Sequence, residues 1–330
     1  MRYLIALVIC LASSLGWAQD WEDQHIFNAD GATASLRILS STDTDLFAPL
    51  IEAFVARNSS VSIEYLVTGT ADIDQRFREA PGAYDIVISS AMDLQLKLAN
   101  DGFARPLETD GHPTWAQWRQ SLFAFTSEPA AIVINRSAFA GHPIPQSRQE
   151  LIEALRARPE VFQNRVGTYD VRRSGLGYLF ATQDARASET FWRLMEVMGG
   201  LDVQLYCCSG KMIDDLADGT IVVAYNVLGS YAQPRSESHD LEIVLPSDFP
   251  TTMMRTAFVS SASDEAELAE RFIQFLISYQ SGPTEEIALL PPLDNGNGAT
   301  IALEPALMTF LDTLKRRQFL TEWESAMIQR

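Results

Sequence analysis

The chain has 330 residues, of which 25 are Lys or Arg and 43 are Asp or Glu, so its formal net charge is −18. This acidic excess excludes a general nucleic-acid binder, because such proteins hold the phosphate backbone with a basic face. The composition, with 47% hydrophobic and 21% charged residues, is that of a globular protein. Its length corresponds to about two domains, and three cysteines are too few for a disulfide-dense scaffold.

Residues 1–18 have the features of an export signal. A positive charge at Arg2 precedes an apolar run over 4–15, and the Gly-x-Ala ending at 16–18 supplies the small residues that signal peptidase needs. The apolar run is too short to span a bilayer comfortably, which argues against the alternative of a membrane anchor. Cys10 lies inside the apolar run, so a lipoprotein signal is not expected either. We therefore predict a cleaved signal peptide and a mature protein in the periplasm.

The first part of the mature chain alternates short strands with amphipathic helices. Apolar strands are predicted at 36–41, 62–69 and 84–91, and each is followed by a stretch with apolar residues at helical spacing. Strand followed by helix, three times over, is typical of a parallel sheet. The fold class is therefore predicted to be α/β.

Each of these three strands ends in small hydroxyl side chains. The residues are Ser40, Ser41, Thr68, Thr70, Ser89 and Ser90. Ligands of open α/β sheets bind beyond the carboxyl ends of the strands, where helix N-termini present unpaired N–H groups. We predict that these side chains line one crevice. The alternative for any single one of them is that it only caps a helix.

A second α/β set follows two apolar strands at 121–139. Its features are a strand and Gly-rich turn within 165–185, an amphipathic helix at 188–200 and a buried strand within 220–232. A further amphipathic helix is predicted over 266–280. No low-complexity linker separates the two sets, so a pair of extended crossings is the expected connection.

Four stretches of the sequence resemble a known family: LRILSSTDTDLFAPLIEAF, YDIVISSAMDLQLKLANDG, TIVVAYNVLGSYA and AFVSSASDEAELAERFIQFLIS. They are similar to periplasmic solute-binding proteins of ABC transporters, in the branch that contains ferric-iron, thiamine, phosphonate and phosphosugar binders. The resemblance implies the two-lobe, type II periplasmic-binding-protein fold, with discontinuous domains joined by two hinge strands. It places 19–130 and 245–330 in lobe I and 131–244 in lobe II.

The same resemblance implies that a small molecule is captured in the cleft between the lobes, which close on it. The implied partner is an ABC permease of the inner membrane. Related chains instead present their ligand to a membrane histidine kinase, so a sensor is the alternative. No cofactor is implied, and we expect a monomer.

The iron binders of this branch carry adjacent tyrosines after the strand that corresponds to TIVVAYNV. Here Tyr225 is followed by Asn226, and the next tyrosine is Tyr231, so the adjacent pair is missing. Phenolates suit ferric iron because they are anionic oxygen donors, and their absence as a pair argues against direct iron ligation. All three residues remain candidates to line a ligand cleft, and iron and thiamine remain alternative ligands.

The turn VRRSGLGYLF is the strongest candidate for binding an anion. Arg172 precedes Ser174 and Gly175 at the predicted start of a helix, where free N–H groups and a guanidinium suit phosphate or carboxylate. Tyr178 would add an apolar wall. We predict a small anionic or phosphorylated organic ligand, with Arg172, Ser174 and Ser89 as its first contacts. The alternative is that the arginines are solvated surface charges.

Cys207 and Cys208 are the only cysteines of the mature chain and are adjacent. In an oxidising compartment they can close a vicinal disulfide, which is a strained ring. The alternative is a pair of buried small hydrophobic residues.

An enzyme is not expected. The four histidines are scattered without an i, i+4 pair, so the spacing of a metal hydrolase is missing and no metal site is predicted. The turn from Gly229 to Tyr231 lacks the G-x-S-x-G pattern of a serine hydrolase.

Overall fold

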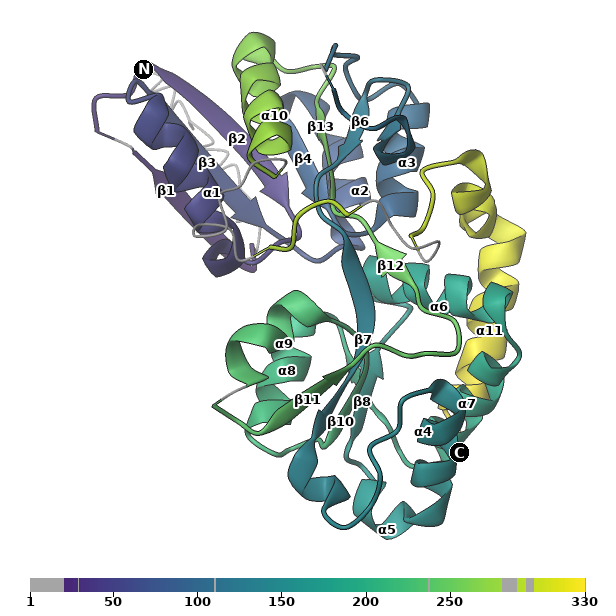
Figure 1. Cartoon of the computed structure of the whole chain (residues 1–330). Coiled ribbons are helices and arrows are strands. Elements are labelled where there is room, and N and C mark those ends of the chain that lie inside the picture. The colour runs from purple at the N-terminus through teal and green to yellow at the C-terminus, as the bar shows by residue number, and fades with distance from the viewer. Residues whose placement is uncertain are drawn as a thin grey trace, which may run out of the picture.

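The computed structural model describes residues 21–329 except 29, 110, 237, 281–289 and 295–299. The predicted signal peptide and Cys10 lie outside the described residues. The described chain folds into two α/β lobes, each built on its own sheet (Figure 1). This confirms the predicted fold class. Among the described residues, no helix is long and apolar enough to cross a membrane.

Lobe I contains a seven-stranded sheet in the order β1-β3-β2-β4-β13-β6-β5. Strands β2, β3 and β4 run parallel, as predicted, and β1, β13, β6 and β5 are antiparallel to their neighbours. The strands are β1 (Asp23–Phe27), β2 (Ala34–Ser40), β3 (Val61–Val67), β4 (Ile86–Ser89), β5 (Gln117–Trp118), β6 (Leu122–Ala124) and β13 (Thr256–Val259). The helices are α1 (Thr44–Arg57), α2 (Asp72–Glu79), α3 (Met92–Asn100) and α10 (Ala266–Gln280), with short 3₁₀ turns η1 (Pro81–Ala83) and η2 (Thr114–Ala116).

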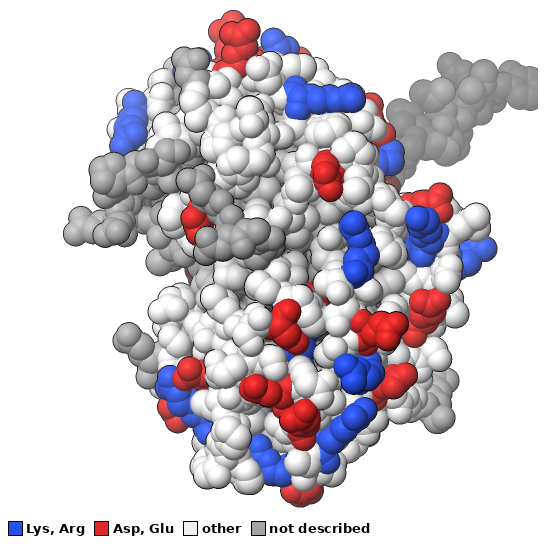
Figure 2. All heavy atoms as spheres, turned by 45° about the vertical axis from the view of Figure 1, so that its right-hand side comes forward, with Lys and Arg blue, Asp and Glu red and all other residues white. Residues whose placement is uncertain are grey.

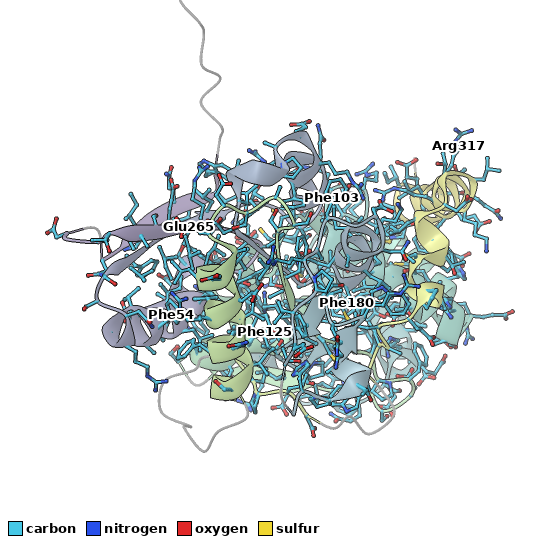
Figure 3. All side chains as sticks on the ribbon, turned by 90° about the horizontal axis from the view of Figure 1, so that it is seen from above. Phe54, Phe103, Phe125, Phe180, Glu265 and Arg317 are labelled. Atoms are coloured by element: carbon cyan, nitrogen blue, oxygen red, sulfur yellow. The ribbon has the colours of Figure 1, made fainter. Side chains whose placement is uncertain are left out.

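Helices cover both faces of this sheet. On one face Phe54 of α1 packs against Phe272 of α10, with 5.0 Å between the ring centroids. On the other face Phe77 of α2 packs on Phe103 and on Phe258 of β13. Figure 3 shows Phe54 beside α1 and α10. Burial of one such side chain contributes about 1.5–3 kcal/mol, so this core holds the loops at the strand ends in place.

Lobe II contains a six-stranded sheet in the order β11-β7-β10-β8-β9, with β12 paired to β7. The strands are β7 (Glu128–Asn135), β8 (Val166–Tyr169), β9 (Gln204–Tyr206), β10 (Val223–Leu228), β11 (Leu241–Val244) and β12 (Thr252–Met253). The helices are α4 (Arg148–Ala157), α5 (Pro159–Phe162), α6 (Gly175–Ala187), α7 (Thr190–Gly200), α8 (Ser209–Ala217) and α9 (Gly229–Ser236), with one 3₁₀ turn, η3 (Arg136–Phe139). Strands β8, β9 and β10 are parallel.

Two crossings lie side by side between the lobes. The chain leaves lobe I from β6 into β7 and returns from β12 into β13. The start of β7 pairs with β12 in antiparallel register, with Glu128 opposite Met253 and Pro129 opposite Thr252. Figure 1 shows β7 and β12 passing through the junction of the lobes. These are the two hinge strands that the family resemblance implied.

The last helix differs from the predicted division of the lobes. Residues 245–330 were assigned to lobe I, but α11 (Thr313–Met327) packs on lobe II (Figure 1). Phe319 stacks on Phe191 of α7, and Trp323 is buried in the same cluster. Before it, η4 (Pro305–Leu311) lies along α3 of lobe I. The exposed side of α11 includes Arg317, which points away from the body of the protein (Figure 3). The burial of these aromatic side chains against α7 is the physical reason that α11 packs on lobe II rather than on lobe I.

Candidate functional site

A cavity lies between the lobes at the carboxyl ends of their parallel strands. Its volume is about 30 Å³, room for one or two water molecules. Lobe I and its hinge crossing contribute Glu22, Ser41, Asp43, Thr68, Gly69, Thr70, Ser90 and Arg255. Lobe II contributes Tyr169, Ser174, Leu176, Cys207, Cys208, Ser209, Leu228 and Tyr231. The serine-bearing turns of lobe I and the turn before α6 of lobe II thus share one hollow.

The predicted hydroxyl residues of lobe I divide into two layers. Ser41 and Ser90 line the cavity, and the Ser41 hydroxyl donates to Ser89 Oγ at 3.3 Å. Ser40 and Ser89 lie beneath them. Ser40 Oγ accepts a hydrogen bond from Tyr65 at 2.7 Å, and Ser89 Oγ accepts one from a backbone N–H at the start of α3. Ser40 and Ser89 therefore support the loops that present Ser41 and Ser90.

The N-terminus of α6 meets lobe I directly. Ser174 caps the helix by accepting a hydrogen bond from the N–H of Gly177 at 3.0 Å. Thr70 of lobe I accepts one from the N–H of Leu176 at 3.2 Å. A Cβ on Gly175 would lie 3.0 Å from the carbonyl oxygen of Thr70, so glycine permits this close approach. The lobes are closed upon each other here.

Two carboxylates line the cavity. The Tyr231 hydroxyl of lobe II donates to Asp43 of lobe I at 3.2 Å. Burial raises the pKa of the Asp43 carboxyl, and this effect exceeds the lowering by the Tyr231 hydrogen bond and by Arg255. Burial also raises the pKa of Glu22, and the charges of Asp43 and Asp72 add to that shift. Both groups would gain from a hydrogen-bond donor or a cation in the cavity.

Arg255 connects the cavity to the hinge. It is 0% exposed, and it forms an ion pair with Glu128, which is also 0% exposed, at 2.9 Å. Arg255 Nη1 donates to Thr42 of lobe I at 2.6 Å, and Ser230 of lobe II donates to the Glu128 carboxylate at 2.6 Å. The pair therefore holds one residue of each lobe. Sequence reasoning missed it, although a lone charge within the apolar stretch MMRTAFV is a signal of a buried partner.

Arg172 lies outside this cavity. Its guanidinium donates to both carboxylate oxygens of Asp170, at 2.8 and 2.7 Å, and reaches Glu324 of α11 at 3.4 Å. It also lies 5.7 Å from the ring centroid of Trp323. These partners balance the charge of Arg172, which we expect from the sequence to hold an anion. Asp170, two positions upstream, is within reach of its guanidinium group.

A second hollow, of about 130 Å³, also lies between the lobes and is lined from lobe I by Ala71 and Asp93. Arg172, Gly175 and Tyr178 line it, and Ser174 lines both hollows. The Tyr178 hydroxyl donates to the carbonyl oxygen of Phe310 at 2.6 Å, so it faces the segment before α11. Separation of the lobes would break the contact between Thr70, which lines the first hollow, and Gly175, which lines the second.

Tyr225 and Asn226 belong to the interior of lobe II. The Tyr225 hydroxyl donates to Asp184 at 2.7 Å and accepts from Arg148 at 2.7 Å. Asn226 donates to the same carboxylate at 2.7 Å. Its positive φ of 61° marks an irregularity in the register of β10. Both side chains donate hydrogen bonds within a buried network, and neither of them lines the cavity. Tyr231, in contrast, does line it.

The adjacent cysteines line the cavity at the end of β9. Their sulfur atoms are 2.7 Å apart, and Cys208 directly precedes α8. Across the described part of the chain, no group of three or more His, Cys, Asp or Glu residues is arranged to hold a metal ion.

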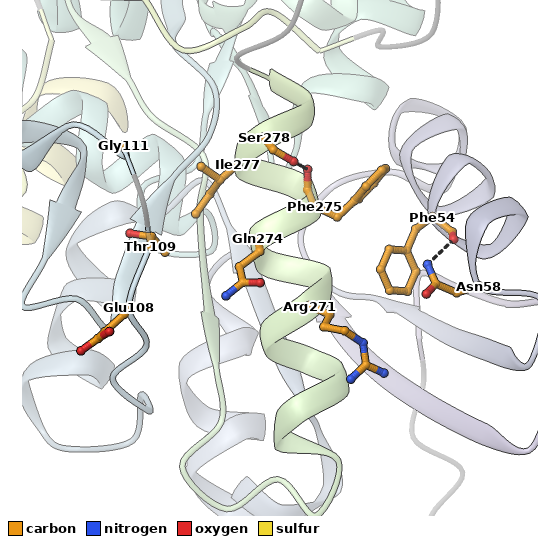
Figure 4. A pocket seen from close by; sticks show the side chains of 10 residues that line it. All are labelled: Phe54, Asn58, Glu108, Thr109, Gly111, Arg271, Gln274, Phe275, Ile277 and Ser278. Carbon is orange, nitrogen blue, oxygen red and sulfur yellow. Dashed lines mark hydrogen bonds between the residues drawn. The ribbon is translucent and has the colours of Figure 1, made fainter.

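A larger hollow, of about 970 Å³, opens on the outer surface of lobe I (Figure 4). It lies between α1 and α10, with Phe54, Asn58 and Arg271 on its sides. The Asn58 amide there donates to the Phe54 carbonyl oxygen at 2.8 Å, within its own helix end. This hollow shares no lining residue with the interlobe cavity and is built by one lobe alone. The interlobe cavity is therefore the better candidate site.

A family model for bacterial extracellular solute-binding proteins matches residues 83–293. The chain belongs to this family. Proteins of the family bind small ligands and deliver them to ABC permeases, and they act outside the cytoplasm as transport components. No curated protein matches the sequence.

Solved structures support the assignment. The substrate-binding protein of an ABC transporter from Agrobacterium tumefaciens is 30% identical over 92% of this chain and 98% of its own, with a TM-score of 0.85. The periplasmic binding protein AfuA from Actinobacillus pleuropneumoniae, solved with fructose-6-phosphate, is 12% identical over 91% of this chain and 100% of its own, with a TM-score of 0.71. A periplasmic thiamin binding protein is 17% identical over 90% and 96%, with a TM-score of 0.66. The last two show the fold alone.

Proposed function

We propose that this solute-binding protein captures a small phosphorylated organic solute in the interlobe cavity and delivers it to an ABC permease of the inner membrane. The observation that carries the proposal is the convergence of helix N-termini on one cavity. Ser90 lies just before α3, Ser174 caps α6, and Ser209 begins α8, and all three line the cavity. N–H groups and hydroxyls at such positions suit phosphate oxygens, and the N–H of Leu176, which Thr70 holds in the closed form, becomes available when the lobes separate.

The remaining lining suits the hydroxyl groups of a sugar-like body. The carboxylates of Glu22 and Asp43 accept hydrogen bonds, and Thr68 and Tyr231 lie beside them. Arg255 adds a positive charge, although Glu128 balances it. A phosphorylated polyol would therefore find donors for its phosphate and acceptors for its hydroxyls in one cleft.

The cavity of about 30 Å³ is smaller than any such solute, so capture requires the lobes to move apart and then close. The hinge crossings at β7 and β12 supply the place for this motion. We further propose that the chain is exported with cleavage after Ala18, resides in the periplasm and acts as a monomer. The N-terminal charge, apolar run and small residues support cleavage there.

A cationic solute such as thiamine is a second candidate. The observation that favours it is the pair of cavity carboxylates, Glu22 and Asp43, whose pKa values are raised by burial. A cation between them would compensate the cost of burying their charge.

Mass spectrometry of the solute released from natively purified protein, followed by calorimetry, tests the proposal. We expect fructose-6-phosphate or another phosphate ester to bind and thiamine not to bind. The variants Glu22→Gln and Asp43→Asn distinguish the two candidate solutes. Loss of a carboxylate should weaken the binding of a cationic solute at least tenfold, because a charged hydrogen bond contributes about 1.5–3 kcal/mol. The same variants should bind a phosphate ester with an affinity within a few-fold of that of the wild type. The matched control is Glu52→Gln, on the exposed side of α1. Binding of thiamine and of no phosphate ester would overturn the proposal.

A further inference from the structure

The adjacent cysteines occupy a defined place in the cavity wall. Cys207 and Cys208 follow β9 and precede α8, and both line the interlobe cavity. Their sulfur atoms are 2.7 Å apart, which brings the two free thiols into direct contact. They are the only cysteines after the predicted signal peptide, so no other thiol of the mature chain competes for either of them.

The same segment forms a contact between the lobes. A Cβ on Gly210, two residues after Cys208, would lie 3.0 Å from a carboxylate oxygen of Asp43 in lobe I. Asp43 in turn accepts the hydrogen bond of Tyr231 from lobe II. The cysteine pair is therefore only two residues along the chain from a contact between the lobes, and a change in its conformation can alter that contact.

We propose that Cys207 and Cys208 form a vicinal disulfide that is part of the ligand site, and that its reduction opens the cleft and weakens solute binding. The inference rests on the proposed function for its second half only. Disulfide formation itself depends on the two thiols and an exported oxidant, not on the identity of the solute.

The oxidation follows thiol–disulfide exchange with a disulfide-bearing oxidant of the exported compartment. One cysteine thiolate attacks the oxidant's disulfide, forms a mixed disulfide and releases one oxidant sulfur as a thiol. The second cysteine then attacks the first, which closes the ring and releases the other oxidant sulfur as a thiol. The two cysteines lose two electrons and two protons, and the oxidant gains them.

Charge explains why reduction would open the cleft. The disulfide has no ionisable group, whereas the dithiol has one that ionises readily: the Cys208 hydrogen bond lowers the pKa of Cys207 to about 7. The neighbouring charges are Glu22, Arg173 and Lys211, and Tyr169 lies close by. Arg173 is exposed and Lys211 is paired with Asp215, while Glu22 shares the cavity. A thiolate beside Glu22 and Asp43 would add a third negative charge to the closed interface.

The first test counts thiols in the mature chain purified without reductant. The protein is denatured and labelled with a maleimide before and after treatment with dithiothreitol. We expect no label before reduction and two labels per chain after it. Two labels before reduction would overturn the proposal.

The second test measures closure and binding in the two redox states. Small-angle scattering requires no solute, and we expect a larger radius of gyration for the reduced chain. Calorimetry with fructose-6-phosphate should give about tenfold weaker binding after reduction, the scale of one unfavourable charge contact in a partly buried site. Scattering and affinity that are the same in both states would overturn the role in the cleft.

Variants separate this inference from the proposed function. The double variant Cys207→Ser, Cys208→Ser should respond to dithiothreitol in neither measurement, and a response that remained would contradict the assignment. If it folds poorly, Cys207→Ser alone serves, because one cysteine cannot close the ring. Binding of neither fructose-6-phosphate nor another phosphate ester by the oxidised chain would refute the proposed ligand class, while the thiol count and the scattering still decide the disulfide and its effect on closure.

Discussion

The hydroxyl of Thr70 in lobe I accepts a hydrogen bond from the backbone N–H of Leu176 in lobe II, with 3.2 Å between the two atoms. A residue of one lobe thus satisfies a free N–H in the first turn of a helix of the other. The contact joins two lobes and exists only while they are together. It is therefore a direct probe of closure.

Thr70→Val removes the acceptor at nearly constant volume and should weaken solute binding about fivefold, because one such hydrogen bond contributes about 1 kcal/mol. Calorimetry with the solute released from natively purified protein measures this affinity. The control is Thr321→Val, an exposed residue whose hydroxyl donates to the Arg317 carbonyl oxygen within α11. Equal affinities for Thr70→Val and wild type would show that this contact does not contribute to closure.

The buried ion pair at the hinge should contribute measurably to the free energy of unfolding. Glu128→Gln leaves the Arg255 guanidinium buried with a neutral partner, and breaking such a pair costs about 3 kcal/mol. Urea denaturation measures the free energy of unfolding. The matched control is Glu242→Gln, which breaks the partly exposed pair with Arg136 and should cost less than about 1 kcal/mol. Similar losses for the two variants would refute a special role of the hinge pair.

Two tyrosines allow a paired test of which side chain serves the cleft. Tyr225→Phe removes a donor to the buried Asp184 and should lower the free energy of unfolding by about 1–3 kcal/mol with little change in solute affinity. Tyr231→Phe removes the interlobe bond to Asp43 and should weaken binding several-fold with a smaller loss of stability. The reverse pattern in calorimetry and denaturation would contradict the placement of both residues.

Asp93 should make stability depend on pH. The residue is 2% exposed, and its Oδ1 atom has no hydrogen-bond partner. Burial raises its pKa to about 7, so the folded state binds its proton more tightly than the unfolded state does. Its contribution is therefore fully present below about pH 4 and is lost as the pH rises to about 7. Asp93→Asn should flatten this profile and raise the stability at pH 8 by up to about 4 kcal/mol.

Asp101 is the control of opposite sign for that experiment. Hydrogen bonds from Lys97 and Arg78 lower its pKa, against the opposing effect of burial. Its contribution should be present at neutral pH and disappear as the pH falls through its lowered pKa. Asp101→Asn should therefore reduce stability at pH 7 and change little in strong acid. The measurement is urea denaturation from strong acid to pH 8. If Asp93→Asn and Asp101→Asn both gave the wild-type dependence of stability on pH, the roles assigned to the two carboxyl groups would be wrong.

Surface charge is distributed differently from what the net charge of −18 suggests. On the face shown in Figure 2, acidic and basic side chains are interspersed over both lobes. Pairs such as Arg136 with Asp240 and Glu242 on lobe II show the same mixing. The solute site therefore depends on local groups in the cleft rather than on the overall field of the protein.

The local patterns predicted the elements of lobe I well. The alternation of apolar strand and amphipathic helix located β2, β3 and β4, because side-chain periodicity is a property of neighbouring residues. The rule that ligands lie beyond the carboxyl ends of parallel strands then brought Ser41, Ser90 and Ser174 into one hollow. These inferences required no knowledge of distant contacts.

The sequence by itself determined the α/β class and the loops that face the cleft, since both follow from short-range patterns and a general rule of sheet geometry, and the family resemblance implied the two lobes. Only the tertiary structure decided that Arg172 pairs with Asp170 and Glu324, that Tyr225 supports Asp184, and that Arg255 meets Glu128 at the hinge. Partner choice for a buried polar group depends on which segments fold together, and in these networks most partners lie far apart in the chain.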